Sequence, residues 1–386
     1  MSFHLVVALS SHGFGHIGQT APIVVALQKQ LPGLRVTIRS NAPKTKLLER
    51  FGPDIDIQQT HTDVGMIQAS ALQVSENESA AAYDDFHTHW EDKVAAEAAQ
   101  LSALDADLVL ANVPYLALAG AKRANIPAIA MCSLNWADIY KYYFLGTRPE
   151  ADTIFPQILA AYRDALMFLR LTPAMTMPDL QNTKVIDPVA QLGKSRRNEI
   201  TRQTGLRPGQ RLVMLSLGGM DLRLPVNNWP RQPGLRFIVP ASWHSQHPDT
   251  IDLECLQMPF ADILASCDAL IAKPGYGSFV EAACLGIPVL YLQRKNWPET
   301  DCLVDWLKQH GRCAEIQTDD FATGSIANTI ETLCMSKAPE PPLPKGIEQA
   351  TKIIVHQLSS TIQQRFSTSD VLQPGQSNIH KKEWNR

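Results

Sequence analysis

The feature that most constrains this chain is a glycine-rich turn that occurs twice, each time between an apolar run and the start of a helical pattern. The first turn covers residues 10–18 and follows the apolar run 3–9. The second covers residues 274–278 and follows the apolar run 267–272. A strand, a glycine turn and a helix form the first unit of Rossmann-like folds. Two such units in one chain predict two domains of this kind.

The runs between the two turns fit the same architecture. Apolar strand-like runs alternate with helical spacing in both halves, which indicates parallel βαβ units. The predicted fold class is α/β, with two Rossmann-like, doubly wound domains that face a cleft. Strands are expected at 3–9, 34–39, 55–59, 107–111, 127–131, 211–217, 235–239, 267–272 and 287–292, and helices at 21–30, 76–104, 155–170 and 346–365.

Composition shifts suggest the domain boundaries of the 386-residue chain. We predict an N-terminal domain over residues 1–190 and a second domain over 191–345. A proline-rich connector then leads to a C-terminal helix at 346–366. Residues 367–386 are polar, lack apolar periodicity, and are predicted to be disordered.

Charge and cysteine content exclude several classes of protein. A formal net charge of −3 argues against nucleic acid as a partner. No apolar run approaches the roughly 18 residues of a membrane-spanning helix, and the N-terminus lacks the basic start of a signal peptide. The chain has seven cysteines, an odd number, and no two of them form a CxxC pair. They predict free thiols in a reducing, cytoplasmic setting.

The first turn matches a dinucleotide-binding pattern through Gly13, Gly15 and Gly18. Bare glycines let a pyrophosphate approach a helix N-terminus. The pattern also calls for an acidic residue at the end of the second strand, where this chain has none. Arg39 stands there and could bind a 2′-phosphate, so an NADP-dependent enzyme is one open alternative.

Two histidines, His12 and His16, flank the glycines of the first turn. A dinucleotide loop has no chemical need for them. A histidine at a strand–helix turn can act as a general base near neutral pH. The alternative is a loop histidine that hydrogen-bonds to local backbone.

The second turn has two interpretations that share the same residues. Ser278 followed by Glu281 fits a capping box, in which each side chain bonds to the other residue's amide. Alternatively, the amides from Gly275 onward hold a phosphate and Glu281 binds ribose. Upstream, Gly218 and Gly219 follow another strand, where a diphosphate could also be held.

Together these stretches resemble the GT-B glycosyltransferases of the family 28 and family 1 type, which use nucleotide sugars. A closer resemblance is to the glycosyltransferase-like N-terminal region of plant L-arabinokinases. It rests on four ordered stretches, 12–16, 63–72, 134–143 and 273–303. We see no second Gly/Ser-rich phosphate loop for a sugar kinase, so kinase activity is not expected.

The resemblance implies a role for each matched residue. His16 would be the catalytic base, with His12 in reserve. Phe260 would face the nucleobase, Glu281 the ribose and Glu299 the donor sugar. The implied donor-side set is Gly13, Gly15, Gly218, Gly219, Phe260, Gly275, Tyr276, Gly277, Ser278, Glu281 and Glu299.

The implied function is a glycosyltransferase that moves a sugar from a nucleoside-diphosphate donor, with UDP expected, to an unknown hydroxyl acceptor. No metal and no cofactor are expected. A nucleotide-sugar hydrolase and a non-catalytic nucleotide-sugar-binding protein remain alternatives. The basic and apolar residues 41–51 suggest a peripheral membrane contact, against the simpler interpretation of a solvated surface.

Two further groups of residues stay open or unassigned. One is an interdomain scaffold or an acceptor site, and contains Asp63, Gln68, Trp136, Asp138 and Tyr140. The other consists of the pairs His87/His89 and His244/His247, which lack a carboxylate cluster and are expected to be surface histidines without a metal.

Overall fold

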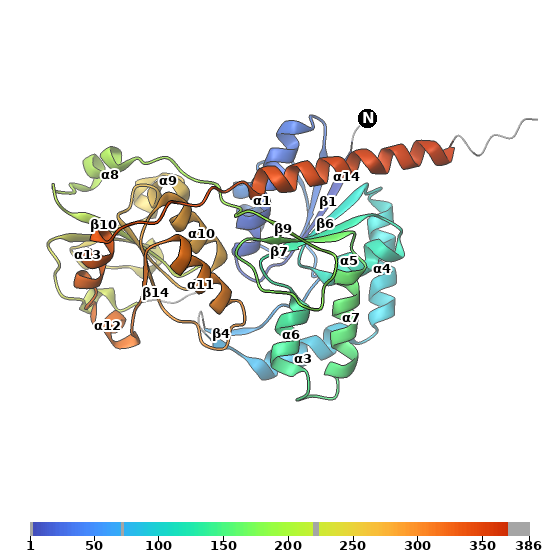
Figure 1. The fold of residues 1–386 in the computed structure, drawn as a ribbon, viewed down its shortest axis with the longest axis horizontal. Coiled ribbons are helices and arrows are strands. Elements are labelled where there is room, and N and C mark those ends of the chain that lie inside the picture. Colours follow the sequence, from blue (N-terminus) through green and yellow to red (C-terminus); the bar gives the residue numbers. More distant parts are fainter. Residues whose placement is uncertain (1–2, 71–72, 219–223, 370–386) are drawn as a thin grey trace, which may run out of the picture.

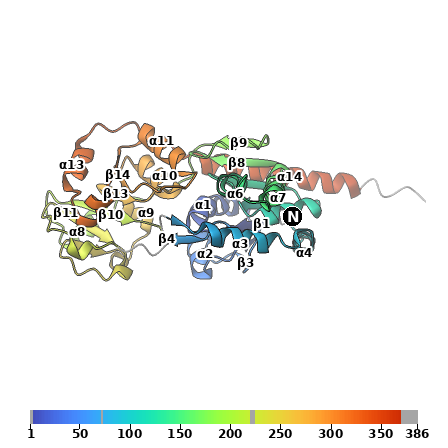
Figure 2. The same ribbon diagram turned by 90° about the horizontal axis from the view of Figure 1, so that it is seen from below.

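The computed structural model describes residues 3–70, 73–218 and 224–369 and contains two parallel sheets, one in each half of the chain (Figure 1). The strand order is β3-β2-β1-β6-β7-β8-β9 in the first sheet and β12-β11-β10-β13-β14-β15 in the second. Helices cover the sheets, and the two halves lie side by side along the long axis (Figure 2). The predicted α/β class with two Rossmann-like domains is confirmed.

The first sheet is formed by β1 (His4–Leu9), β2 (Arg35–Arg39), β3 (Asp56–Gln58), β6 (Leu108–Asn112), β7 (Ala128–Cys132), β8 (Met167–Leu171) and β9 (Thr183–Ile186). Its domain also contains a small hairpin, β4 (Gln68–Ser70) and β5 (Gln73–Val74). The helices are α1 (Gly15–Gln30), α2 (Lys44–Phe51), α3 (Glu76–His87), α4 (Trp90–Ala103), α5 (Tyr115–Arg123), α6 (Trp136–Phe144) and α7 (Ala151–Arg163).

The second sheet is formed by β10 (Arg211–Ser216), β11 (Leu235–Val239), β12 (Thr250–Asp252), β13 (Ala269–Ala272), β14 (Val289–Tyr291) and β15 (Cys313–Glu315). Its helices are α8 (Arg197–Thr204), α9 (Phe260–Leu264), α10 (Tyr276–Leu285), α11 (Thr300–His310), α12 (Thr318–Thr323) and α13 (Ala327–Met335). The last helix, α14 (Gly346–Ser369), returns to the first domain and packs on α1. Short 3₁₀ turns lie at Val226–Asn228, Ala241–Trp243 and Glu254–Leu256.

The run of apolar residues in β1 reflects a strand that is buried on both faces. Leu5, Val7 and Leu9 belong to one apolar cluster, which includes residues of α1 and α14. Val6 and Ala8 point the other way, into the cluster that includes residues of α4 and α5. This alternation follows from the two-residue period of a strand, so a continuous apolar run is what a central parallel strand requires.

Three local predictions were wrong. Residues 76–104 form two helices instead of one, because His89 takes a left-handed conformation (φ 56°) between them. The helix expected at 155–170 is α7 (Ala151–Arg163), and β8 (Met167–Leu171) takes the remaining residues. The helix expected at 21–30 begins earlier, at Gly15.

The chain crosses between the domains twice, and the two crossings are joined. The amide of Gly346 donates to the carbonyl of Pro188 at 3.0 Å. Gln349 accepts from the amide of Asp187 at 2.7 Å and donates to its carboxylate at 2.9 Å. The predicted boundary at 190 lies in this region, between the last strand of the first sheet and the first strand of the second. Helix α14 runs to Ser369, and residues 370–386 of the predicted tail lie outside the described residues.

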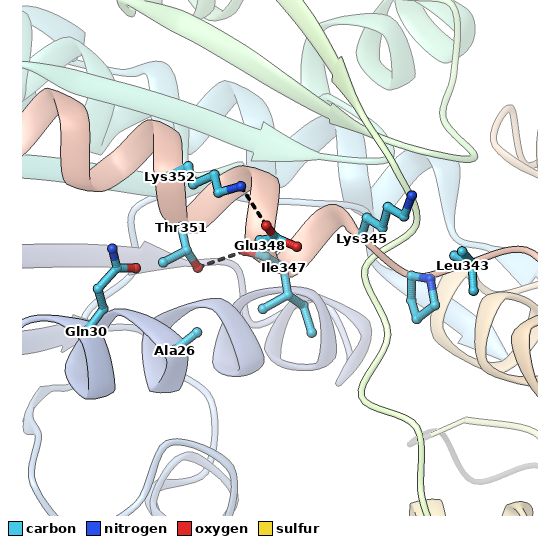
Figure 3. A pocket seen from close by; sticks show the side chains of 9 residues that line it. Ala26, Gln30, Leu343, Lys345, Ile347, Glu348, Thr351 and Lys352 are labelled. Atoms are coloured by element: carbon cyan, nitrogen blue, oxygen red, sulfur yellow. Dashed lines mark hydrogen bonds and ion pairs between the residues drawn. The ribbon is translucent and has the colours of Figure 1, made fainter.

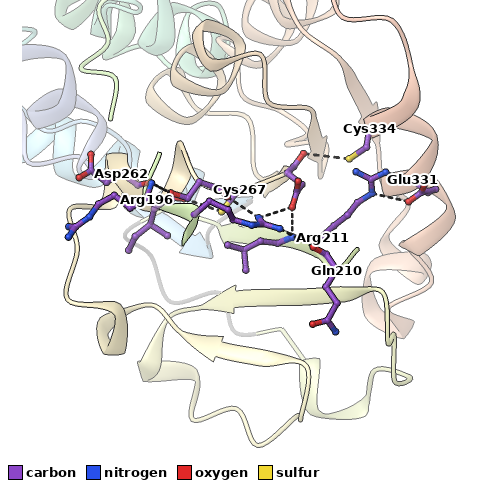
Figure 4. Close-up of polar contacts among 12 residues, drawn as sticks. Arg196, Gln210, Arg211, Asp262, Cys267, Glu331 and Cys334 are labelled. Atoms are coloured by element: carbon purple, nitrogen blue, oxygen red, sulfur yellow. Dashed lines mark hydrogen bonds and ion pairs between the residues drawn. The ribbon is translucent and has the colours of Figure 1, made fainter. Parts of the chain in front are cut away.

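The amino ends of the second sheet are held by charged contacts (Figure 4). Arg197 on α8 pairs with Asp268 at 2.8 Å, and Asp268 accepts from the amide of Leu212 at 2.6 Å. Arg211 pairs with Glu331 on α13 at 2.9 Å. These contacts fix helices to the sheet at the end opposite its carboxyl edge.

Docking of α14 on α1 should contribute several kcal/mol to the free energy of unfolding, because Ala350, Ile354 and Leu358 form a fully buried stripe along α14. We expect Ile354→Ala to lower that free energy by about 2–5 kcal/mol. Urea unfolding followed by circular dichroism measures it. The matched control is Lys352→Ala on the exposed face of the same helix, with an effect within about 0.5 kcal/mol. Equal losses in both variants would mean that α14 does not dock as described.

Candidate functional site

The candidate site lies where the carboxyl ends of the two sheets meet. The order of the first sheet reverses between β1 and β6, and that of the second between β10 and β13. Ligands bind at such switch points in open α/β sheets. The loop after β1 carries the first glycine turn, and the loop after β13 carries the second. The fold therefore brings both predicted turns to one interdomain region.

His16 lies in the first turn of α1 and is only 5% exposed. Its Nδ1 lies 2.9 Å from the side-chain oxygen of Asn112, the last residue of β6. The Asn112 amide nitrogen donates to Gln19 at 3.1 Å and to Thr20 at 2.9 Å, which fixes the amide's orientation. His16 Nδ1 must therefore carry a proton and donate it to Asn112. Nε2 keeps its lone pair, and no residue of the described ranges bonds to it.

The electrostatic environment keeps His16 neutral. Burial lowers its pKa from 6.5 to about 4, against the opposing effect of the Asn112 hydrogen bond. A neutral imidazole with a free Nε2 can accept a proton from a hydroxyl group placed beside it. The residue after Asn112 is Val113, whose φ of 72° is rare for a buried β-branched side chain.

His12 differs from His16 in that its ring packs against two tryptophans. Its ring stacks on Trp297 at 5.7 Å and meets the edge of Trp136 at 5.2 Å. Its Nε2 accepts from the side-chain amide of Gln68 at 3.4 Å. Burial, reinforced by the charges of Arg294 and other nearby groups, lowers its pKa to about 3. His12 therefore lies between two tryptophan rings, with its Nε2 bonded to Gln68.

The capping-box interpretation of the second glycine turn was wrong. Helix α10 begins at Tyr276 with Gly275 as its N-cap, so Ser278 is already the third helical residue. No side chain caps this end. The amides of Tyr276, Gly277 and Ser278 belong to the first turn, which has no intrahelical acceptor, and they give the helix a positive end.

Two titratable groups flank this helix start. Glu281 is half-buried one turn further along α10; burial raises its pKa to about 7, and Arg50 opposes the shift. Lys273 lies directly after β13; burial, with the charge of Arg294, lowers its pKa to about 8. Lys273 also lies beside Gly218, whose φ of 84° and lack of a side chain make room for it. The sequence analysis did not select Lys273.

Residues 293–299, which we call the bridging segment, extend from the second domain to the first. Arg294 donates to Gln68 at 2.7 Å, and Glu299 accepts from Ser133 at 2.6 Å. The Tyr143 hydroxyl donates to the carbonyl of Asn296. Trp297 is buried within the apolar cluster of the first domain. Apart from Glu299, sequence reasoning assigned no role to this segment.

The structure modifies several predicted donor contacts. The Tyr276 hydroxyl accepts from the amide of Val189 at 2.9 Å and donates to the carbonyl of Thr172 at 3.1 Å, so only its backbone amide is left for a ligand. The Glu299 carboxylate is shared between Ser133 and the indole N–H of Trp297, the latter at 3.2 Å. Phe260 begins α9 and packs, half-buried, against the core. Gly13 and Gly15 are exposed, and Gly219 lies outside the described residues.

Four of the five residues left open between an interdomain scaffold and an acceptor site make their contacts inside the first domain. The Trp136 indole donates to Asp63 at 2.7 Å, and burial raises the pKa of Asp63 to about 6. Trp136 and Tyr140 are fully buried. Asp138 belongs to the N-cap of α6, where Asn135 accepts from its amide at 2.8 Å. Gln68 is the exception, since it reaches across to Arg294.

The expectation that Arg39 could bind the 2′-phosphate of NADP was wrong. Arg39 is 0% exposed and pairs with Glu97 on α4, and its guanidinium also donates to Gln100 at 2.6 Å. A guanidinium fixed in this way cannot reach a 2′-phosphate. The arginine instead fastens β2 to α4.

Other predicted or visible features lie outside this site. His87 uses both ring nitrogens, with Gln157 at 2.7 Å and Tyr115 at 3.2 Å. Within the described ranges, no cluster of three metal-ligating residues occurs and no helix combines the length and apolar character needed to cross a bilayer. Leu47 and Phe51 of α2 are buried, which leaves that helix little apolar surface for a membrane. A hollow of about 550 Å³ lies elsewhere, between α1 and the start of α14 (Figure 3).

A plant protein resembles this chain over almost the whole of its length. No model of a known protein family matches the chain. The L-arabinokinase of Arabidopsis thaliana is 26% identical over 379 residues, which cover 96% of this chain and 36% of that protein. The chain thus spans about a third of the length of this relative.

Solved structures share the fold at low identity. UGT89C1 of Arabidopsis thaliana, solved in complex with UDP, has a TM-score of 0.57 and 16% identity, over 94% of this chain and all of that one. The calicheamicin glycosyltransferase CalG4 has a TM-score of 0.56 and 15% identity, over 93% of this chain and 95% of that one. The chain therefore has the GT-B fold.

Both His16 and His12 should resist protonation. Their pKa values lie near 4 and 3, whereas an unfolded chain binds these protons near 6.5. Each histidine therefore lowers the free energy of unfolding as the pH falls from about 6.5 toward about 4. We expect long-range ¹H–¹⁵N NMR to show neutral His16 with the proton on Nδ1 between about pH 5 and pH 7. Asn112→Ala should remove that tautomer preference. A His16 ring that gains a proton near pH 6.5 would contradict the described environment.

Proposed function

We propose that this chain is a glycosyltransferase that moves a sugar from a nucleoside-diphosphate donor to a hydroxyl acceptor. The observation that carries this is the placement of two different groups at the carboxyl ends of the two sheets. His16, with a free Nε2, follows β1 of the first sheet, and the start of α10 with Lys273 follows β13 of the second. A base and an anion site in this arrangement suit the transfer of a group that leaves with a diphosphate.

The second domain would hold the donor. The amides at the start of α10 and the Lys273 ammonium group suit a diphosphate, since both present positive charge to it. Glu281, half-buried one turn later, is placed to accept hydrogen bonds from ribose hydroxyls. We expect UDP as the nucleotide because UGT89C1, which shares this fold, was solved with UDP. The positive charge comes from the protein's own groups, so the proposal includes no metal and no cofactor.

The first domain would hold the acceptor beside His16. As the acceptor oxygen attacks the anomeric carbon of the sugar, its proton passes to His16 Nε2. The bond from that carbon to the diphosphate oxygen breaks, and its electron pair leaves with the nucleoside diphosphate. The bridging segment would exclude water from this step, because Trp297 and Glu299 are buried against the first domain.

The donor site is tested by calorimetric titration of the full chain with UDP, GDP, dTDP, CMP and NADPH. We expect one nucleoside diphosphate to bind, with UDP first. Glu281→Ala should weaken that binding by about 1–3 kcal/mol, the cost of a lost hydrogen bond to a charged group. Cys284→Ser, one turn further along α10, is the matched control and should leave the affinity unchanged. Binding of NADPH alone would overturn the proposal.

The base is tested by the release of the nucleotide from a panel of UDP-sugars, measured with and without added hydroxyl acceptors. We expect His16→Ala to lower turnover by roughly 10²–10⁴-fold, the usual contribution of a general base, with donor affinity unchanged. His89→Ala, an exposed histidine outside the cleft, is the control. Full turnover in His16→Ala would remove His16 as the base, and equal release without any acceptor would indicate a hydrolase instead.

A further inference from the structure

Arg294, in the bridging segment, is a buried cation whose bonding is incomplete. The residue is 7% exposed, and its guanidinium lies 3.9 Å above the ring of Trp297. Nη2 donates to Gln68 at 2.7 Å, whereas Nε is buried without a hydrogen-bond partner in the described part of the chain. No carboxylate of the described residues lies within ion-pair distance of it. Burial lowers its pKa to about 10, which still leaves the group charged at neutral pH.

A buried charge without a counter-ion is unfavourable, because the lost hydration is not replaced. Glu299 is the acidic residue whose charge raises the pKa of Arg294. Its carboxylate oxygens, however, accept hydrogen bonds from Ser133 and Trp297 and not from Arg294. A bound anion would supply both the missing charge and the missing acceptor for Nε.

The neighbours of Arg294 indicate where that anion lies. Arg294 and His12 share two neighbours, since both bond to Gln68 and both lie against the ring of Trp297. Arg294 therefore lies beside the first glycine turn, and on the donor side its charge lowers the pKa of Lys273. In a donor held by Lys273 and α10, the phosphate attached to the sugar is the one that points toward the acceptor.

We propose that Arg294 binds the sugar-proximal phosphate of the donor diphosphate and that Gln68 is its positioning residue. This inference rests on the proposed function and assigns a leaving-group contact within it. When the bond between the anomeric carbon and the phosphate oxygen breaks, the electron pair goes to that oxygen, and Arg294 offsets the new charge. Because Gln68 belongs to the first domain, the guanidinium is fully oriented only while the two domains are in contact.

The test compares UDP with UMP, which lacks the sugar-proximal phosphate, by calorimetric titration of the full chain. We expect Arg294→Gln to weaken UDP binding by about tenfold or more and UMP binding by less than about twofold, the mark of a lost charge-assisted bond to one phosphate. Gln68→Ala should shift the UDP-to-UMP affinity ratio in the same direction by a smaller factor. Glu281→Ala should weaken both nucleotides equally.

Controls separate a ligand contact from a structural role. Arg236→Gln alters another arginine whose Nε is buried without a partner among the described residues, at the amino end of β11, and should leave both affinities unchanged. Without ligand, Arg294→Gln should melt at or above the wild-type temperature, because it removes an uncompensated buried charge. A lower melting temperature with an unchanged affinity ratio would overturn the inference while leaving the proposed function intact. Failure of the wild-type chain to bind any nucleoside diphosphate would overturn both.

Discussion

The contact on which the site depends is that of the bridging segment with the first domain. Residues 293–299 follow the fifth strand of the second sheet, yet Trp297 is buried in the core of the other domain and Glu299 bonds to Ser133 there. These contacts bring the carboxyl ends of the two sheets together. Without them, His16 and the start of α10 would belong to two separate surfaces.

The chemistry of His16 depends on a neutral partner. The side-chain oxygen of Asn112 accepts a hydrogen bond from Nδ1–H and so fixes the tautomer, as a carboxylate would. Unlike a carboxylate, it supplies no charge to stabilise a protonated ring. Burial acts in the same direction, so both effects keep the ring neutral. In the proposed reaction, such a base would favour a concerted transfer, in which proton and sugar move together.

Much of the fold, but less of the site, could be predicted from the sequence. The glycine turns, the apolar strands and His16 carry local signals that a few neighbouring residues define. Gln68 and Arg294 are 226 positions apart, and Ser133 and Glu299 are 166 apart. No local pattern encodes such pairs, because their meeting depends on how two finished domains pack. Lys273 was visible beside the second turn, but only its place next to Gly218 and Arg294 indicates a role.

The joined crossings between the domains have a consequence for how this protein can change. Pro188, where the chain leaves the first domain, and Gly346, where it returns, are linked by a backbone hydrogen bond of 3.0 Å. Topologically, the second domain is thus an insertion into the first, with both of its ends at one junction. Because Trp297 of this insertion also belongs to the core of the first domain, a module exchanged at the junction would have to bring its own bridging segment.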